Sequence, residues 1–187
     1  EIVTGKLTSN YEDKLEKLLL PARELGFTIP LEAATHIHFD GAVFMQPMSF
    51  KNVVELLNRY RLPLRFLFQT NPHCIRLGDW PSEFLPFLRS TDYAGLTWPE
   101  TQLCLRDMGL SKFCDINIRN LIYDLPHKKT IEVRILPGFL NSKPVLIAAE
   151  IINLIFFRAL SNGNFPPQDE LGEDELSVLQ MLKEIGW

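Results

Sequence analysis

Three short segments in which apolar and polar residues alternate constrain the fold of this chain more than any other feature. In residues 34–40 (Ala-Thr-His-Ile-His-Phe-Asp), two histidines and an aspartate alternate with Thr, Ile and Phe. Residues 115–119 and 130–135 repeat the pattern, with Ile or Val between charged and amide residues. Because successive side chains of a strand point to opposite faces, each segment predicts a strand. Together they predict a sheet with one apolar face and one face of histidine, carboxylate and arginine.

The remaining elements are predicted mostly as helices around that sheet. Ser9 and Glu12 have the spacing of a capping box, which predicts a helix to about Leu25. Apolar spacing and breakers predict further helices over 50–68, bent or divided at Pro63, and over 99–108, 144–160 and 173–185. Strands are predicted at 1–4, 113–123 and 130–136, the last two joined by a hairpin at 126–129. This order favours an α+β fold, an antiparallel sheet with helices packed on its apolar face.

Length and composition exclude several classes of protein. The 187 residues suffice for one sizeable core. We expect residues 1–160 to form the main domain, with a loop and helix at 161–187 packed on it. A net charge of −4 gives no basic field, which argues against nucleic acid as a partner. Three cysteines without metal-type spacing favour a reduced, cytoplasmic setting. The longest apolar run, 145–157, is too short to span a bilayer, which argues against a membrane partner.

Two pairs of residues on the predicted strands are the main candidates for a functional site. His36 and His38 on one strand face would stand about 7 Å apart, close enough to share a metal ion or to divide work between metal and substrate. Glu132 and Arg134 also share a face, where the arginine could clamp a carboxylate or phosphate while the glutamate binds a cation. Both pairs also suit a simpler interpretation, as hydrogen-bonded surface histidines and a cross-strand ion pair. Asp115, Asn117 and Arg119 fit either a second clamp or a solvated strand face.

These segments resemble the putative amidoligase family of the glutamine synthetase and γ-glutamylcysteine ligase superfamily. The resemblance lies in Thr-His-Ile-His-Phe at 35–39, Asp-Ile-Asn-Ile-Arg-Asn-Leu at 115–121 and Thr-Ile-Glu-Val-Arg-Ile-Leu-Pro-Gly at 130–138. It extends from Glu1 to about Phe156. It implies a glutamine-synthetase-like sheet with a concave polar face. It also implies an ATP-dependent ligase that joins a small-molecule or peptide carboxylate to an amine through an acyl phosphate.

The resemblance assigns a role to each matching residue. His36 and Glu132 match the metal ligands, with Glu1 as a further cation ligand. His38 would lie near the phosphate or substrate, and Arg134 matches the arginine that contacts the acid and the transferred phosphate. Phosphate and nucleotide contacts are expected from Asn117, Arg119 and Arg76. The implied cofactors are ATP and Mg²⁺, although mixed His and Glu ligands also suit Mn²⁺ or Zn²⁺.

The start of the sequence differs from the family pattern, and for this reason two alternative functions stay open. The family has an earlier Glu-x-Glu strand with further metal and nucleotide ligands, which this sequence does not contain. We therefore expect an upstream segment or a second chain to complete the site, and little activity from these 187 residues alone. One alternative is a non-haem iron 2-oxoglutarate oxygenase using His38, Asp40, His127 and Arg134. The other is a non-catalytic binding domain with an incomplete ligase site.

Overall fold

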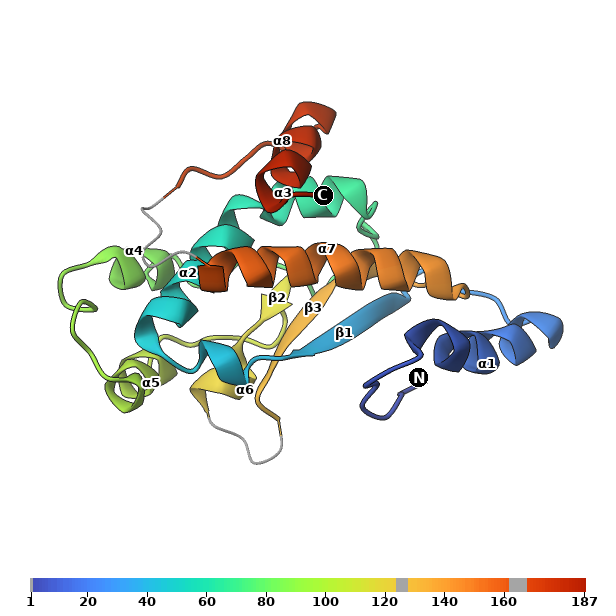
Figure 1. Ribbon diagram of the computed structural model, residues 1–187, viewed down its shortest axis with the longest axis horizontal. Helices are drawn as coiled ribbons and strands as arrows, with labels where there is room; N and C mark the ends of the chain where they lie inside the picture. The colour runs from blue at the N-terminus through green and yellow to red at the C-terminus, as the bar shows by residue number, and fades with distance from the viewer. Residues whose placement is uncertain (1, 124–127, 162–167) are drawn as a thin grey trace.

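A small antiparallel sheet lies at the centre of the molecule. The computed structural model describes residues 2–123, 128–161 and 168–187. Within these residues the sheet has three strands, β1 (Ala34–Asp40), β2 (Ile116–Asn117) and β3 (Thr130–Pro137), in the order β1-β3-β2. Both pairings are antiparallel. Helices surround the sheet (Figure 1), so the predicted α+β class is confirmed.

The register brings the polar residues of three strands into one row. His38 on β1 and Asn117 on β2 are both paired with Glu132 on β3. The β1–β3 ladder shifts by one residue between Thr35 and Ile37, so that two β3 residues stand opposite His36. Such a bulge bends the strand and re-aims the neighbouring side chains. Glu132 therefore lies on the central strand with a polar neighbour on each side.

Two long helices cover the apolar face of the sheet. α2 (Pro47–Arg59) and α7 (Ser142–Ser161) pack against each other, and Figure 1 shows α7 running across the strands. The ring of Phe39 on β1 meets the ring of Phe156 on α7 edge to face, with centroids 5.3 Å apart. Ile131 and Val133 of β3 are also fully buried in this core. Burial of these side chains fixes which face of the sheet remains open, because a slip by one residue would invert it.

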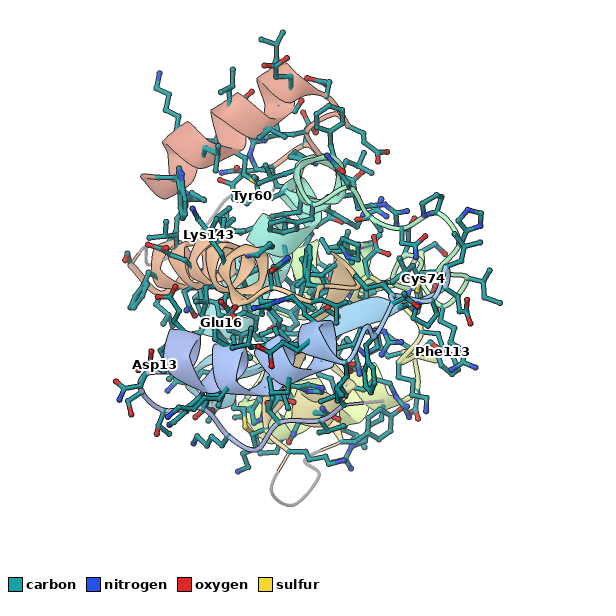
Figure 2. The ribbon with its side chains drawn as sticks, turned by 90° about the vertical axis from the view of Figure 1, so that its right-hand side faces the viewer. Asp13, Glu16, Tyr60, Cys74, Phe113 and Lys143 are labelled. Atoms are coloured by element: carbon teal, nitrogen blue, oxygen red, sulfur yellow. The ribbon has the colours of Figure 1, made fainter. Side chains whose placement is uncertain are left out.

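Shorter helices complete the fold. They are α1 (Tyr11–Glu24), the 3-10 turn η1 (Ala42–Phe44), α3 (Arg61–Leu67), α4 (Phe84–Arg89), α5 (Trp98–Arg106), α6 (Arg119–Ile122) and α8 (Glu175–Ile185). α1 packs on α7 and α8 packs on α3 and α7. Glu16 of α1 faces α7 (Figure 2), where its carboxylate accepts hydrogen bonds from the Ser142 backbone N–H at 2.9 Å and from Arg23 at 2.7 Å. These charge-assisted bonds join α1 to the start of α7.

α7 is a 20-residue helix that is long and apolar enough to cross a membrane, by length and composition only. The core helix of a soluble protein passes the same test. Here the buried residues of α7, among them Ile152 and Ile155, contact the core above the sheet.

The predicted strand over 113–123 is wrong for most of its length. Only Ile116–Asn117 are in a strand, and Arg119 already belongs to α6. The Asn117 side-chain oxygen accepts a hydrogen bond from the Arg119 backbone N–H at 3.0 Å, a turn that asparagine forms readily and that ends the strand. The strand expected at 1–4 is also not found, because residues 2–4 are exposed and outside any strand. Glu1 and residues 124–127 of the expected hairpin lie outside the described residues.

Two helix boundaries also differ from the prediction. α1 begins after Asn10, which has a left-handed backbone (φ 51°), so the Ser9–Glu12 capping box does not form. The helix expected over 50–68 divides at Tyr60 rather than at Pro63. Proline is tolerated in a first helical turn, where its missing N–H has no helical partner. The break at Tyr60 places Pro63 in that first turn of α3.

Candidate functional site

Glu132 is the centre of a polar cluster on the face of the sheet that carries the exposed histidines of β1. Its Oε1 accepts a hydrogen bond from Arg134 Nη1 at 2.7 Å, and its Oε2 accepts one from Asn117 Nδ2, also at 2.7 Å. His36 Nδ1 lies 3.2 Å from Oε1 and His38 Nε2 lies 3.7 Å from the same atom. We call these five residues, His36, His38, Asn117, Glu132 and Arg134, the Glu132 cluster.

Burial differs sharply within the Glu132 cluster. The side chains of Glu132 and Arg134 are 8% and 9% exposed, whereas those of His36 and His38 are 32% and 51% exposed. The two histidines therefore lie between the buried ion pair and solvent. A ligand arriving from solvent would meet the imidazoles first and the carboxylate and guanidinium beneath them.

Glu132 is ionised at neutral pH. Burial alone would raise the pKa of this carboxyl group, because a charge loses hydration in the interior. Hydrogen bonds from His36 and Asn117, with the charges of Arg134 and His38, outweigh burial and lower the pKa of Glu132 to about 2. The cluster thus keeps a fixed negative charge that can attract a cation.

Arg134 retains unused hydrogen-bonding capacity. Its Nε atom is buried and has no hydrogen-bond partner among the described residues. Its backbone N–H donates to the Asp115 carbonyl at 2.9 Å, which holds the main chain in place. Buried polar atoms are normally paired, so an unpaired guanidinium nitrogen beside exposed histidines is consistent with a site that accepts an anionic group.

Thr130 and Asn120 support the cluster and were not predicted. Thr130 Oγ1 lies 3.3 Å from His38 Nδ1 and accepts a hydrogen bond from Asn120 Nδ2 at 2.9 Å. This contact helps to orient the imidazole of His38. Thr130 is two residues before Glu132 on the same strand face, so the period-2 pattern contained the signal. Asn120 is placed by α6, which the sequence did not predict.

Within the Glu132 cluster a magnesium ion would find one carboxylate ligand, Glu132, and would need its other ligands from water and substrate. Among the described residues there is no group of three or more His, Cys, Asp or Glu side chains placed to hold a metal ion. Mg²⁺ is commonly bound by one or two carboxylates together with substrate phosphates and water. Glu132 Oε2 accepts one hydrogen bond in the described structure and so retains a lone pair for such a cation. His36, the other residue predicted as a metal ligand, offers an imidazole nitrogen, which suits Mn²⁺ or Zn²⁺ better than Mg²⁺, and its Nδ1 already contacts Glu132 Oε1. Glu1 lies outside the described residues.

The other predicted site residues lie elsewhere. Arg119 stacks on the Tyr123 ring, with 4.7 Å between guanidinium carbon and ring centroid. Arg76 is exposed in the loop between α3 and α4, 5.6 Å from the centre of the Phe113 ring. Asp115 is buried and accepts hydrogen bonds from Arg65 through both oxygens, so it forms no second clamp beside Glu132. Two described hydrogen bonds join these residues to the Glu132 cluster, one from the Arg119 backbone N–H to Asn117 Oδ1 and one from the Arg134 backbone N–H to the Asp115 carbonyl.

The iron-site alternative gains little from the geometry. His38 and Asp40 lie on the same side of β1, but Asp40 Oδ1 accepts a hydrogen bond from the Ala42 backbone N–H at 3.1 Å and stabilises the turn into η1. His127 lies outside the described residues. In the part of the chain that the structure describes, no group of three His, Cys, Asp or Glu side chains is placed to hold a metal ion, and this includes the two histidines beside Glu132.

Comparison with protein-family models, curated proteins and solved structures found no match. The resemblance to the amidoligase family therefore depends on the three strand motifs. Two of those motifs, on β1 and β3, supply four of the five residues of the Glu132 cluster.

Proposed function

We propose that the chain is an amidoligase with a glutamine-synthetase-like site, which uses ATP to join a carboxylate to an amine. The observation that carries the proposal is the Glu132 cluster itself. An ionised glutamate, a buried arginine with an unpaired Nε and two exposed histidines converge on the open face of the central strand. This combination suits a ligand that brings both a cation and an anionic group.

The proposed chemistry follows from what amide formation requires. A carboxylate is a poor electrophile, so ATP first transfers its γ-phosphoryl group to a carboxylate oxygen, giving an acyl phosphate and ADP. The amine then attacks the acyl carbon, loses a proton and displaces inorganic phosphate. Negative charge accumulates where substrate and phosphates meet, and preorganised cations stabilise it. Bound Mg²⁺ would supply part of that positive charge.

Within the cluster each residue has a distinct task in this proposal. Arg134 donates hydrogen bonds to the acid substrate and to the phosphate that is transferred. Glu132 and His36 hold the cation, while Asn117 fixes the Glu132 carboxylate through Oε2. His38, oriented by Thr130, lies nearest to solvent and contacts the phosphate or substrate. Arg76 and Arg119 would reach phosphates only with a change in position, because each now contacts an aromatic ring.

A second candidate is a binding domain that retains the cluster without turnover. Two described cavities lie elsewhere on the molecule, and neither is lined by a residue of the Glu132 cluster. A site that binds a nucleotide–cation complex without enclosing it would exclude water poorly, and catalysis depends on that exclusion.

The test is ATP turnover that requires both substrates. We expect the complete protein to form ADP and phosphate only when ATP, Mg²⁺, a carboxylate such as glutamate and an amine are all present. Glu132→Ala should abolish turnover, because it removes a cation ligand and its charge together. The matched control is Glu55→Ala. Glu55 is also a buried carboxylate, bound to Arg89 at 2.8 and 2.7 Å between α2 and α4, away from the sheet face.

The outcomes separate the three candidates. Turnover that survives Glu132→Ala contradicts the ligase proposal. Calorimetric binding of Mg²⁺ with a non-hydrolysable ATP analogue, lost in Glu132→Ala but without turnover in the wild type, supports the binding domain. Consumption of O₂ and 2-oxoglutarate with bound iron supports the oxygenase.

A further inference from the structure

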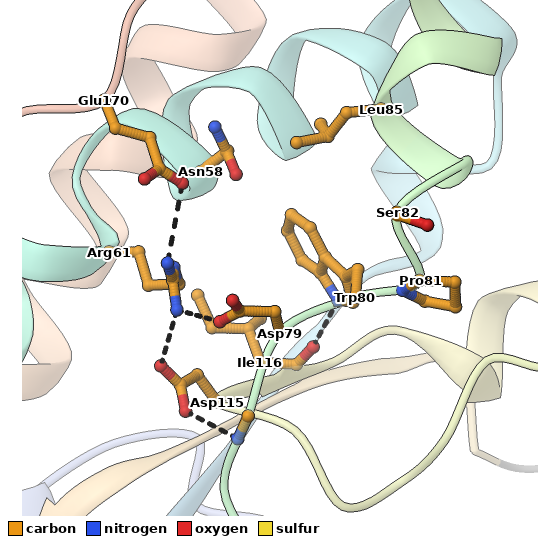
Figure 3. Close-up of a pocket in the computed structure, with 11 residues that line it drawn as sticks. Asn58, Arg61, Asp79, Trp80, Pro81, Ser82, Leu85, Asp115, Ile116 and Glu170 are labelled. Atoms are coloured by element: carbon orange, nitrogen blue, oxygen red, sulfur yellow. Dashed lines mark hydrogen bonds and ion pairs between the residues drawn. The ribbon is translucent and has the colours of Figure 1, made fainter.

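A cavity of about 160 Å³ lies between the end of α2, the start of α3 and the loop before α4 (Figure 3). Its lining includes residues from four distant parts of the sequence: Asn58, Arg61, Trp80, Leu85, Asp115 and Glu170. An engineered cavity of about 150 Å³ in another protein binds benzene, so this volume accommodates roughly six non-hydrogen atoms. The cavity is therefore large enough for a small organic molecule.

Asn58 supplies an unpaired polar group at this cavity. The residue is only 7% exposed, and its side-chain amide has no hydrogen bond to any described residue. Figure 3 shows the amide directed into the open space between Glu170 and Leu85. The amide therefore has a donor and an acceptor that are available to a ligand in the cavity.

The charge at the cavity favours a cation. Arg61 lies among three carboxylates: it pairs with Asp79, and its guanidinium is 3.7 Å from Asp115 Oδ2 and 3.6 Å from Glu170 Oε1. Arg65 also binds Asp115, at 2.9 Å. Three carboxylates and two arginines leave one excess negative charge. Asp79 and Glu170 are the more exposed carboxylates, at 66% and 39%, so the excess lies at the mouth.

An aromatic wall lies opposite these charges. The indole Nε1–H of Trp80 donates to the Ile116 carbonyl at 2.9 Å, and the ring meets Phe84 edge to face at 5.3 Å. These two contacts hold the Trp80 ring in one orientation at the cavity, with Leu85 beside it. The face of an indole attracts cations and also packs against alkyl chains.

We propose that this cavity binds a small organic cation, a short primary alkylammonium. The alkyl chain packs against Trp80 and Leu85, and the ammonium group donates hydrogen bonds to Glu170, to Asp79 and to the Asn58 side-chain oxygen. An ammonium has three donors and no acceptor, which matches three oxygens. This site is separate from the Glu132 cluster and does not depend on the ligase proposal.

Isothermal titration of the chain with n-butylammonium tests the site, with n-butanol and butyrate as neutral and anionic probes of similar length. We expect n-butylammonium to bind about tenfold more tightly than n-butanol, because only the cation meets the excess charge. Butyrate should not bind. Equal affinity for n-butanol, tighter binding of butyrate or no binding of n-butylammonium would overturn the proposal.

Two matched variants test whether Glu170 supplies the negative charge that attracts the cation. Glu170→Gln removes the excess negative charge at the mouth and should weaken n-butylammonium binding about tenfold. Glu173→Gln changes the net charge of the chain equally, at an exposed position that does not line the cavity. It should leave the affinity unchanged. Thermal unfolding verifies that both variants fold. Equal losses in the two variants would show that overall charge, not this cavity, attracts the cation, and would refute the site.

Discussion

Two carboxylates in this protein have the same lowered pKa but different surroundings. Glu184 on α8 accepts hydrogen bonds from Arg59 Nε and Nη2 at 3.1 and 2.8 Å, from Tyr60 Oη at 2.6 Å and from Gln180 Nε2 at 2.9 Å. The Arg59 hydrogen bonds are the largest cause that lowers its pKa to about 2. Glu132 reaches the same value through His36, Asn117, Arg134 and His38 against the opposing effect of burial.

The two carboxylates differ in whether the polar groups around them have free hydrogen-bonding capacity. The Glu184 carboxylate is enclosed by an arginine, a phenol and an amide, which joins α8 to the α2–α3 junction. The Tyr60 phenol is protonated near neutral pH, as any tyrosine is, and burial raises the pKa of Tyr60 further. The Glu132 cluster keeps two exposed histidines, an unpaired Arg134 Nε and a spare lone pair on Oε2. A low pKa alone therefore marks an ion pair, and only the unused groups mark a candidate site.

The largest expected effect is on stability when either carboxylate is removed. Glu132→Ala leaves the 9% exposed guanidinium of Arg134 without its counter-charge, and we expect a loss of about 3–5 kcal/mol in the free energy of unfolding. The Glu184 side chain is more exposed than that of Glu132, at 22% against 8%, and Arg59 keeps a hydrogen bond to the Asp169 carbonyl at 2.8 Å. Glu184→Ala should therefore cost only about 1–3 kcal/mol. Urea unfolding of both variants measures this.

The double variant Glu132→Leu with Arg134→Met is the control, because replacing a buried pair by apolar residues often costs little. It should recover most of the stability that Glu132→Ala loses. If Glu132→Ala costs less than Glu184→Ala, the guanidinium of Arg134 reaches solvent easily and the contrast in burial is overstated.

Whether the sequence predicts a contact depends on how far apart in the chain the contacting residues lie. The alternation in residues 34–40 and 130–135 correctly places His36, His38, Glu132 and Arg134 on one face, because each strand fixes its own side-chain directions. The end of β2 was missed, because a single bond between Asn117 and the Arg119 N–H replaces the strand by a turn. The cavity was missed too, since Asn58, Trp80 and Glu170 meet only through tertiary packing.

The next largest expected effect is the dependence of the unfolding free energy on pH. Each glutamate has its folded-state pKa lowered from 4.5 to about 2, so its stabilisation is full above pH 4.5 and is lost as the pH falls toward 2. The difference in unfolding free energy between wild type and Glu132→Gln should therefore shrink over that window, by on the order of 3 kcal/mol at most. Glu184→Gln should show the same window and a change of the same size, because the pKa of Glu184 is lowered to the same value.

Urea unfolding at steps between pH 2 and pH 7 gives both curves. The prediction is wrong if the difference in unfolding free energy between wild type and Glu132→Gln changes mainly between pH 6 and pH 7. In that case a group other than the Glu132 carboxylate would control the stability of the cluster.

The smallest expected effect on stability, and the sharpest distinction of function, comes from His38→Ala. The His38 side chain is 51% exposed and its contacts to Glu132 and Thr130 are 3.7 and 3.3 Å long, so its removal should change the unfolding free energy by about 0.5 kcal/mol or less. His73→Ala is the control, since that histidine is also exposed but lies in the loop before α4.

If the face that carries the Glu132 cluster binds a nucleotide–cation complex, His38→Ala should weaken calorimetric binding of Mg²⁺ with an ATP analogue several-fold, because it removes a donor to phosphate. His73→Ala should not. Equal binding by the two variants would mean that His38 is a surface residue of a structural ion pair, and that the Glu132 and Glu184 carboxylates differ in exposure but not in function.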